Sequence, residues 1–368
     1  MKIKGINLKV ISMRMKKPFT THLETVTNRE AIIVEIIDSD GLNGYGEVVA
    51  FSSPWYTEET VKTSYHMLKD FFIPLLQKTR IAHPNELTAL LSKFRRNQMA
   101  KAGLETAIWD LYAKEQQKSL SVLLGGTQST IPSGVVVGAK TIAESLTQIE
   151  QFLNDGYQRV KIKISPENDL MLVSEIRKQF PKLQLMADAN SAYSLSEIAR
   201  LQALDEFGLL MIEQPLAYDD IVDHAKLQRE LKTPICLDES IVTFDDARRA
   251  VELGSCRVIN IKIGRVGGLT TAKRIHDYCY RHHIPVWCGG MLEYGISRAH
   301  NIALASLPGF SIAGDISASS RYWEEDITIP EVFVKQGMIE VPTGHGIGYL
   351  PNKKRIQDVL LSEESFVL

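Results

Sequence analysis

The sequence predicts an α/β protein in which a (β/α)7β barrel of the TIM type follows an N-terminal α+β capping domain. Three observations lead to this fold class. The 368 residues exceed the length of one ordinary domain. From about residue 131 onward, a short apolar stretch followed by an amphipathic stretch recurs about eight times, which is typical of a closed parallel barrel. Along the same region, five charged residues recur about 25 residues apart, the length of one strand–helix unit.

Residues 1–125 are predicted to form the capping domain. Alternating apolar positions in Ile3–Val10 and Ala31–Ile37 indicate strands, and Gly41–Gly46 is typical of a hairpin turn. Helical spacing follows at about 57–76, 85–95 and 99–117.

Residues 126–325 are predicted to form the barrel. Its expected strands are 132–138, 158–164, 183–188, 209–213, 234–238, 256–263, 285–289 and 310–315. Its expected helices are 141–154, 167–180, 194–205, 218–231, 243–253 and 267–282. The alternative is an open doubly wound sheet, which usually carries a Gly-rich phosphate turn after its first strand. No GxGxxG motif occurs there.

The tail, residues 326–368, contains strand-like pieces such as Gly337–Val341 and is expected to pack back on the capping domain. The composition is that of a globular protein, with 44% hydrophobic and 23% charged residues. A net charge of −2 argues against nucleic-acid and membrane-surface partners. No signal peptide or membrane-length apolar run is present, so we expect a cytoplasmic protein whose four cysteines are reduced.

The strongest functional signal is the spacing of charged residues in the barrel region. Lys163, Asp188, Glu213, Asp238 and Lys262 follow one another at intervals of 25, 25, 25 and 24 residues. Each therefore falls at the C-terminal end of its own successive strand, which is the rim where barrel enzymes place their chemistry.

Strand alternation supports this placement. In Val160–Ile164 the aliphatic residues share one face of the strand, and Lys161 and Lys163 share the other. In Ile259–Ile263 the isoleucines likewise share one face of the strand, and Asn260 and Lys262 share the other. These polar side chains should point into the barrel, where Lys161 is either a direct partner of Lys163 or packs one layer below it.

In a ring of eight strands, Lys163 closes the second strand and Lys262 the sixth, so the two amines should face each other across the mouth. The three acids fill the arc between them and repel one another unless a cation lies among them. Oxygen ligands with vacant positions favour Mg²⁺ or Mn²⁺ over zinc. Taken one at a time, Asp188 and Asp238 could instead cap the following helices.

This geometry suits removal of a proton from the carbon beside a carboxylate. The metal and the ammonium groups would stabilise the enolate charge, and desolvation together with neighbouring cations should lower a lysine pKa toward neutrality. Two opposed lysines permit racemisation, whereas one lysine acting twice on the same face permits elimination.

The barrel motifs resemble the enolase superfamily, muconate-lactonizing subgroup. The motifs are Lys161-Ile-Lys163, Asp188-Ala-Asn190, Glu213-Gln-Pro215, Asp238-Glu239-Ser240 and Lys262-Ile-Gly264. Residues 289–326 further resemble o-succinylbenzoate synthases and N-succinylamino acid racemases. The resemblance covers nearly the whole chain. It implies that Asp188, Glu213 and Asp238 bind Mg²⁺ and that Lys163 and Lys262 are the acid/base pair.

The resemblance also implies a small-molecule carboxylate substrate, bound by Lys161, Ser133, Asn190, Gly290, Met291 and Glu293. Arg265 is a feature of racemase-type members, but a salt bridge at the rim is nearly as good an explanation. Glu293 could equally be a charge at a helix N-terminus. Loops at Lys16–Leu23 and Phe51–Tyr56 carry Phe19, Phe51, Trp55 and Tyr56, which could form a lid or simply pack between the domains.

Several alternatives remain open. A dipeptide epimerase should show an Asp-x-Asp pair near the eighth strand, whereas Gly314–Ser317 departs from that pattern. A mandelate-racemase-like enzyme should place a histidine on the seventh strand, and Val286–Gly289 has none. A muconate cycloisomerase shares the same lysines and acids, and a non-catalytic binding barrel belongs to a different class. A homo-oligomer is expected.

Overall fold

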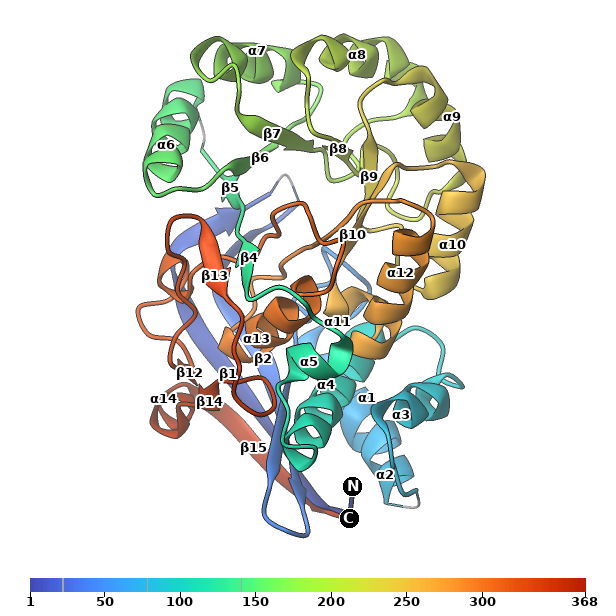
Figure 1. Cartoon of the computed structure of the whole chain (residues 1–368), viewed down its shortest axis with the longest axis vertical. Coiled ribbons are helices and arrows are strands. Elements are labelled where there is room, and N and C mark those ends of the chain that lie inside the picture. The colour runs from blue at the N-terminus through green and yellow to red at the C-terminus, as the bar shows by residue number, and fades with distance from the viewer. Residues whose placement is uncertain (22, 78, 140) are drawn as a thin grey trace.

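The protein is described as a computed structural model covering residues 1–21, 23–77, 79–139 and 141–368. A sheet from the two ends of the chain lies below a barrel-like array of strands and surrounding helices (Figure 1). Both chain termini lie at the far end of the lower sheet. None of the helices in the described ranges is both long and apolar enough to span a bilayer.

The lower sheet is antiparallel, and its strand order is β15-β1-β2-β3. Its strands are β1 (Ile3–Thr20), β2 (Thr25–Asp38), β3 (Asn43–Val48) and β15 (Leu360–Val367). Helix α4 (Gln98–Glu115) crosses this sheet so closely that a Cβ on Gly46 would lie 2.1 Å from the Gly103 carbonyl oxygen. Glycine is therefore required at position 46 because the backbones of strand and helix touch there.

The remaining helices of this part are short. They are α1 (Val61–Met67), a π-helical turn η1 (Leu68–Phe72), α2 (Ile73–Leu76), α3 (Pro84–Leu91) and α5 (Leu120–Leu124). The predicted helix at 57–76 is thus three consecutive pieces that start at Val61. Thr60 caps the first piece by accepting from the Thr63 backbone N–H, which explains why the helix starts there.

The barrel contains a seven-stranded sheet of order β11-β10-β9-β8-β7-β6-β5, with all neighbours parallel. Its strands are β5 (Val135–Val137), β6 (Arg159–Lys163), β7 (Gln184–Asp188), β8 (Ile212–Glu213), β9 (Ile235–Leu237), β10 (Val258–Ile261) and β11 (Val286–Cys288). Chain neighbours are also sheet neighbours, as the recurring strand–helix pattern predicts.

The predicted eighth strand at 310–315 does not form as a regular strand. Instead, the Asp315 N–H donates to the Cys288 carbonyl at 2.9 Å and the Gly134 N–H donates to the Gly314 carbonyl at 2.8 Å. A Cβ on Gly314 would lie 2.7 Å from the Cys288 oxygen, so the chain here is pressed against its neighbour. These backbone contacts link the two ends of the seven-stranded sheet, so the ring closes through Gly314 and Asp315.

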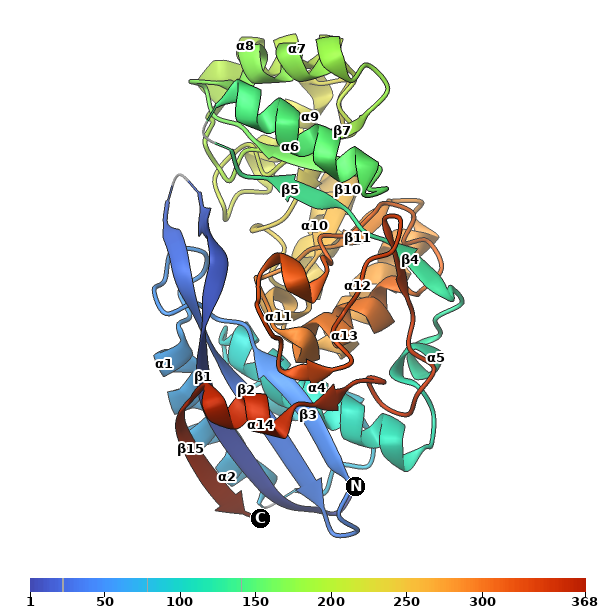
Figure 2. The same ribbon diagram turned by 90° about the vertical axis from the view of Figure 1, so that its left-hand side faces the viewer.

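Helices cover the outside of the ring (Figure 2). They are α6 (Ile142–Asn154), α7 (Asp169–Gln179), η2 (Leu195–Glu197), α8 (Ile198–Ala203), η3 (Leu204–Phe207), α9 (Val222–Glu230), α10 (Phe244–Leu253), α11 (Ile263–Val266), α12 (Leu269–Arg281) and α13 (Gly295–Ala305). Helix α13 was not predicted. Ten of its eleven residues are buried, including Arg298, His300 and Asn301, so it lacks the polar face that marks an amphipathic helix.

The end of the chain serves both parts of the molecule. Strand β13 (Met338–Glu340) pairs with β4 (Thr130–Pro132) beside the barrel, whereas β15 pairs antiparallel with β1. The remaining elements of this region are η4 (Ser319–Arg321), β12 (Thr328–Ile329), β14 (Leu350–Pro351) and α14 (Lys353–Asp358).

One sequence-based expectation about the capping domain needs correction. The segment Lys16–Leu23, expected as a loop, continues β1 to Thr20, where Phe19 pairs with Val26 of β2; His22 lies outside the described residues. The β1–β2 hairpin extends from the sheet toward the barrel (Figure 2). All four cysteines are free and buried, as predicted for reduced thiols.

Buried glutamates join the lower sheet and α4 to helices of the barrel. Glu47 of β3 accepts from the Tyr294 and Ser297 N–H groups at 2.8 and 2.9 Å, so it caps the N-terminus of α13. Glu105 of α4 accepts from Leu269 and Thr270 at 2.7 and 2.9 Å and does the same for α12. Each carboxylate satisfies backbone donors that the helix itself leaves unpaired.

Glu47 predicts a pH dependence of stability. Burial raises the pKa of Glu47 from 4.5 to about 7, although the two backbone hydrogen bonds oppose this change. The folded chain therefore binds a proton that the unfolded chain has released between pH 4.5 and 7, and stability falls as pH rises through this window. Relative to Glu47→Gln, the wild-type free energy of unfolding should fall by an amount on the order of 3 kcal/mol from pH 4.5 to 8.

Urea unfolding at the two pH values measures this difference. Glu230→Gln, at an exposed position on α9, is the control and should follow wild type. Parallel behaviour of wild type and Glu47→Gln at both pH values would rule out titration of Glu47.

Candidate active site

The register of the parallel strands brings the predicted charged residues to one end of the ring. Lys163, Asp188 and Glu213 are the last residues of β6, β7 and β8, and they are paired in register across the sheet. Asp238 and Lys262 follow directly after β9 and β10. The spacing of about 25 residues thus corresponds to one strand–helix unit per charged residue.

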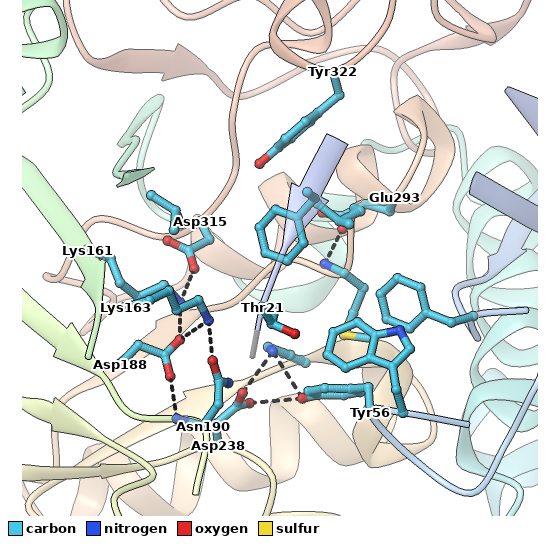
Figure 3. Close-up of a pocket in the computed structure, with 18 of the residues that line it drawn as sticks. Thr21, Tyr56, Lys161, Lys163, Asp188, Asn190, Asp238, Glu293, Asp315 and Tyr322 are labelled. Atoms are coloured by element: carbon cyan, nitrogen blue, oxygen red, sulfur yellow. Dashed lines mark hydrogen bonds and ion pairs between the residues drawn. The ribbon is translucent and has the colours of Figure 1, made fainter. Parts of the chain in front are cut away.

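Lys163 is held by residues of the neighbouring strand end (Figure 3). Its Nζ donates to Asp188 Oδ2 at 2.7 Å and to Asn190 Oδ1 at 2.6 Å. Asn190 lies just past β7 at a φ of +41°, a conformation that asparagine tolerates better than most residues. The Lys163 side chain is 26% exposed, so its amine reaches the cavity.

Lys161 binds three acids at once. Its Nζ lies 2.6 Å from Asp315 Oδ2, 3.1 Å from Glu213 Oε2 and 3.3 Å from Asp188 Oδ2. It therefore shares the Asp188 oxygen with Lys163 and neutralises buried carboxylates, in agreement with its predicted inward direction. Asn260 donates to the other Glu213 oxygen at 2.7 Å, so that fully buried acid has both oxygens paired.

Lys262 is held on the opposite flank. Its Nζ donates to Asp238 Oδ2 at 2.9 Å and to the Tyr56 hydroxyl at 3.0 Å. Arg265 donates to Asp238 Oδ1, and its other nitrogens bond the backbone carbonyls of Ile241 and Asn260. Arg265 is 1% exposed and does not line the cavity around the lysines. In this structure it forms a salt bridge with Asp238.

The alternative of helix capping fails for both aspartates. Helix α10 is capped by Thr243, and η2 is capped by Ser194. Asp188 and Asp238 therefore cap neither of these helices. Besides lysine and arginine side chains, Asp188 accepts from the Asn190 N–H and Asp238 from the Tyr56 hydroxyl, each at 3.2 Å.

The electrostatics of the lysine–acid pairs differ from the expectation that a lysine pKa is lowered. Burial alone lowers the pKa of Lys262, but Tyr56, Glu239 and Glu213 outweigh it and hold that pKa above its ordinary value. The expected lowering of a lysine pKa is therefore wrong for Lys262 in this arrangement, because anionic neighbours outnumber cationic ones. Burial raises the pKa of Glu213, and the adjacent Asp188 raises it further.

The predicted convergence of three acids on one point is not formed. Across the described ranges, no three Asp, Glu, His or Cys side chains are gathered closely enough to hold a metal ion. The reason is visible in the ion pairs, since each of Asp188, Glu213 and Asp238 is turned toward an ammonium or guanidinium group.

The donor set nevertheless fits a hard divalent cation. Asp188 and Glu213 are register partners, and the Lys161 ammonium already lies between their oxygens as a stand-in cation. Asp238 follows the next strand, so the three acids are neighbours. Rotation about their side-chain bonds would redirect the three carboxylates toward one ion without backbone movement. Oxygen donors without sulfur or nitrogen are those that Mg²⁺ and Mn²⁺ prefer.

A cavity opens above these residues, with about 660 Å³ of empty space including the part open to solvent. Its wall beside the ion pairs is charged, and the rest is mainly aromatic and apolar. The charged lining residues are Lys161, Lys163, Lys262, Arg298, Asp188, Asp238, Glu293 and Asp315. The others are Phe19, Thr21, Phe51, Trp55, Tyr56, Val136, Asn190, Gly290, Met291, Leu292 and Tyr322.

Most of the predicted substrate contacts lie at this cavity. The aromatic residues both pack on one another and form its wall: Phe51 and Trp55 have ring centroids 4.7 Å apart, and Trp55 and Tyr56 5.7 Å. Ser133 is an exception, because it is buried outside the lining and its hydroxyl donates to the Ile316 carbonyl at 2.7 Å. Glu293 lines the cavity while accepting from Asn301 at 2.8 Å, near the start of α13.

Asp315, Arg298 and Tyr322 are among the lining residues that were not predicted as site residues. Asp315 ends the segment that closes the ring, so the same rule that identified Asp188 could have found it. Arg298 lies on the unpredicted helix α13. Tyr322 lies on the far side of the cavity with its hydroxyl pointing inward (Figure 3), and no periodic signal marks it.

Comparisons with known proteins agree with this architecture. Residues 5–125 match the family described as the mandelate racemase / muconate lactonizing enzyme N-terminal domain. Residues 144–355 match the family described as enolase C-terminal domain-like.

Relatives match over nearly the full chain. The o-succinylbenzoate synthase of Bacillus subtilis is 57% identical over 95% of each chain. The N-succinylamino acid racemase of Thermus thermophilus is 45% identical over 95% of this chain and 94% of the relative. A solved enolase-superfamily structure from Listeria innocua has a TM-score of 0.97 and 43% identity over 100% of this chain and 99% of that chain.

More distant structures share the fold alone. The muconate lactonizing enzyme of Pseudomonas putida has a TM-score of 0.89 but only 20% identity, covering 98% of this chain and 100% of that chain.

The ion pairs of Asp315 predict a large effect on stability. Asp315 bridges Lys161 at 2.6 Å and Arg159 at 2.8 Å, and both cations are almost fully buried. Asp315→Asn removes the charge that balances the buried Arg159 guanidinium and leaves it neutral partners such as the Ala313 carbonyl, so the free energy of unfolding should fall by about 3 kcal/mol. Asp358→Asn, at an exposed position on α14, is the control for urea unfolding. A loss below about 1 kcal/mol would contradict this account of the buried pairs.

Proposed function

The chain belongs to the mandelate racemase / muconate lactonizing group of the enolase superfamily, and on that premise we propose that it is a divalent-metal-dependent enzyme that removes the proton beside a substrate carboxylate. Its two candidate reactions are those of its relatives, o-succinylbenzoate synthesis and N-succinylamino acid racemisation.

One observation carries the proposal. Lys163 and Lys262 line the same cavity from β6 and from the end of β10, with three strands between them. In a ring closed through Gly314 and Asp315, this separation corresponds to opposite sides of the mouth. A carbon held between the two amines is open to proton transfer on either face.

Asp188, Glu213 and Asp238 would hold the metal, which we take to be Mg²⁺ or Mn²⁺. When bound, such an ion supplies positive charge that stabilises the enolate formed as the proton leaves. Carboxylates that bind the ion would no longer pair with the lysines, and a lysine amine freed in this way could act as a base.

In the synthase reaction, neutral Lys163 takes the proton from the ring carbon beside the carboxylate. The same ammonium then returns that proton to the departing hydroxyl, and water leaves. Lys262 stays protonated and stabilises the enolate. In the racemase reaction, one lysine takes the α-proton of an N-succinyl amino acid and the other delivers a proton to the opposite face.

The charge of the cavity favours a dianionic substrate. The charged lining residues are four basic and four acidic, so the wall is neutral as a whole. A divalent cation adds two positive charges, which a substrate with two carboxylates balances. Both candidate substrates carry two carboxylates, one beside the reacting carbon and one on the succinyl group.

The same charge balance would suit a muconate cycloisomerase. That alternative is supported by distant structural likenesses at 20–23% identity, against 57% and 45% for the synthase and the racemase. A non-catalytic barrel would need no lysine held on each side of the cavity.

Two single variants test the proposal. Lys163→Ala and Lys262→Ala should each lower racemisation of an N-succinyl amino acid by about 10³-fold or more, because each removes one of the two bases. In deuterated water with Mg²⁺, each variant should still exchange the α-proton of one enantiomer, and the two variants should spare opposite enantiomers. Nuclear magnetic resonance of the α-proton measures both rates.

Lys354→Ala, at an exposed position on α14, serves as the control. Comparing kcat/KM for 2-succinyl-6-hydroxy-2,4-cyclohexadiene-1-carboxylate, the substrate of the synthase reaction, and for N-succinyl amino acids decides which activity dominates in the wild type. Full racemase activity in either lysine variant would refute the assignment of two bases.

A further inference from the structure

Asn190 lies between Lys163 and a second acid. Its Oδ1 accepts from Lys163 Nζ at 2.6 Å, and its Nδ2 donates to Glu239 Oε1 at 3.1 Å. The three side chains come from the ends of β6, β7 and β9 and form a chain of hydrogen bonds that bypasses Asp188 (Figure 3 shows its first link).

The direction of the amide matters because its two ends have opposite hydrogen-bonding character. A lysine ammonium has three donors and no acceptor, so only the oxygen end of Asn190 can bind it. A rotation of the amide by half a turn would point an NH₂ group at the ammonium. The acceptor on the other side of the amide therefore decides whether Lys163 has this partner.

Glu239 is suited to that task. Its Oε1 is an acceptor for Asn190, and its Oε2 is buried with no hydrogen-bond partner in the described structure. A carboxylate offers acceptors only, so the nitrogen end of the amide is the end that it favours. Glu239 lines a second, outer cavity together with Asn190 and Tyr56, and it does not line the cavity that contains the lysines.

Lys262 has no comparable chain. Its partners are Asp238 at 2.9 Å and the Tyr56 hydroxyl at 3.0 Å, and neither group has an amide to orient. The two amines are therefore held by different hydrogen bonds, and Glu239 acts on Lys262 only through its negative charge, which helps to raise the pKa of Lys262.

We propose that Glu239 is a positioning residue for Lys163: it orients the Asn190 amide so that the amide oxygen holds the Lys163 amine in the cavity. The inference rests on the proposed function for its kinetic consequence. The direction of the Asn190 amide does not depend on that function.

Glu239→Gln tests the kinetic consequence. The introduced glutamine keeps one acceptor oxygen and gains an NH₂ donor. When that NH₂ faces Asn190 Oδ1, the NH₂ end of Asn190 turns toward Lys163. Deuterium exchange should slow about 10- to 100-fold for the enantiomer whose exchange Lys163→Ala abolishes. Exchange of the other enantiomer, which depends on Lys262, should not slow, because losing the Glu239 charge lowers the pKa of Lys262, whereas a general loss of structure would slow both exchanges.

Two further variants make the test specific. Glu58→Gln makes the same chemical change at an exposed residue of the same outer cavity and should leave both exchange rates unchanged. The double variant Glu239→Gln with Asn190→Asp restores a donor–acceptor pair with its direction reversed and again offers an oxygen to Lys163. Exchange at the Lys163-dependent enantiomer should recover toward the wild-type rate.

A crystal structure of Glu239→Gln gives a readout without turnover. Lys163 Nζ should leave Asn190, so that the distance of 2.6 Å between them lengthens beyond hydrogen-bonding range. An unchanged distance with the NH₂ of the introduced glutamine facing Asn190, or an equal loss of exchange for both enantiomers, overturns the role of Glu239. If the wild type exchanges neither enantiomer, the proposed racemisation fails, while the crystal structure still decides the role of Glu239.

Discussion

The site depends on the in-register pairing of parallel strands, which places charged residues at the same end of neighbouring strands. Lys163, Asp188 and Glu213 end three adjacent strands and are register partners, so their side chains lie close together. Burial of such charges is tolerated only if each finds an opposite charge. Lys161, Lys163, Lys262 and Arg265 supply those opposite charges to the three consecutive acids. Two of these amines, Lys163 and Lys262, lie on separate flanks of one cavity.

The N-terminal part completes the site. The Tyr56 hydroxyl lies 3.0 Å from Lys262 Nζ and 3.2 Å from Asp238 Oδ1, although these residues are about half the chain apart. Such contacts hold only if the lower sheet is fixed against the barrel. Glu47 and Glu105 provide this by capping barrel helices from the other part, so the same buried glutamates that stabilise the fold also position one wall of the cavity.

Much of this could be predicted from the sequence because a barrel is periodic. The interval between Lys163 and Lys262 and the alternation around each lysine follow from the strand–helix repeat and the strand pleat. Features without a period were missed. Asp315 closes the ring from an irregular segment, Tyr322 reaches the cavity from outside any strand, and α13 is buried on all sides. The pairing of Lys262 with acids, which raises its pKa, depends on side-chain directions that no spacing reveals.

The central claim is that three acids turn from their lysines to one divalent cation and leave the two amines facing a substrate carbon. A crystal structure with Mn²⁺ and an N-succinyl amino acid tests it most directly. The account predicts one anomalous peak about 2.1 Å from oxygens of Asp188, Glu213 and Asp238. It also predicts that the α-carbon lies between the Nζ atoms of Lys163 and Lys262. Acids still paired to lysines with the ion elsewhere, or both amines on one side of that carbon, would contradict it.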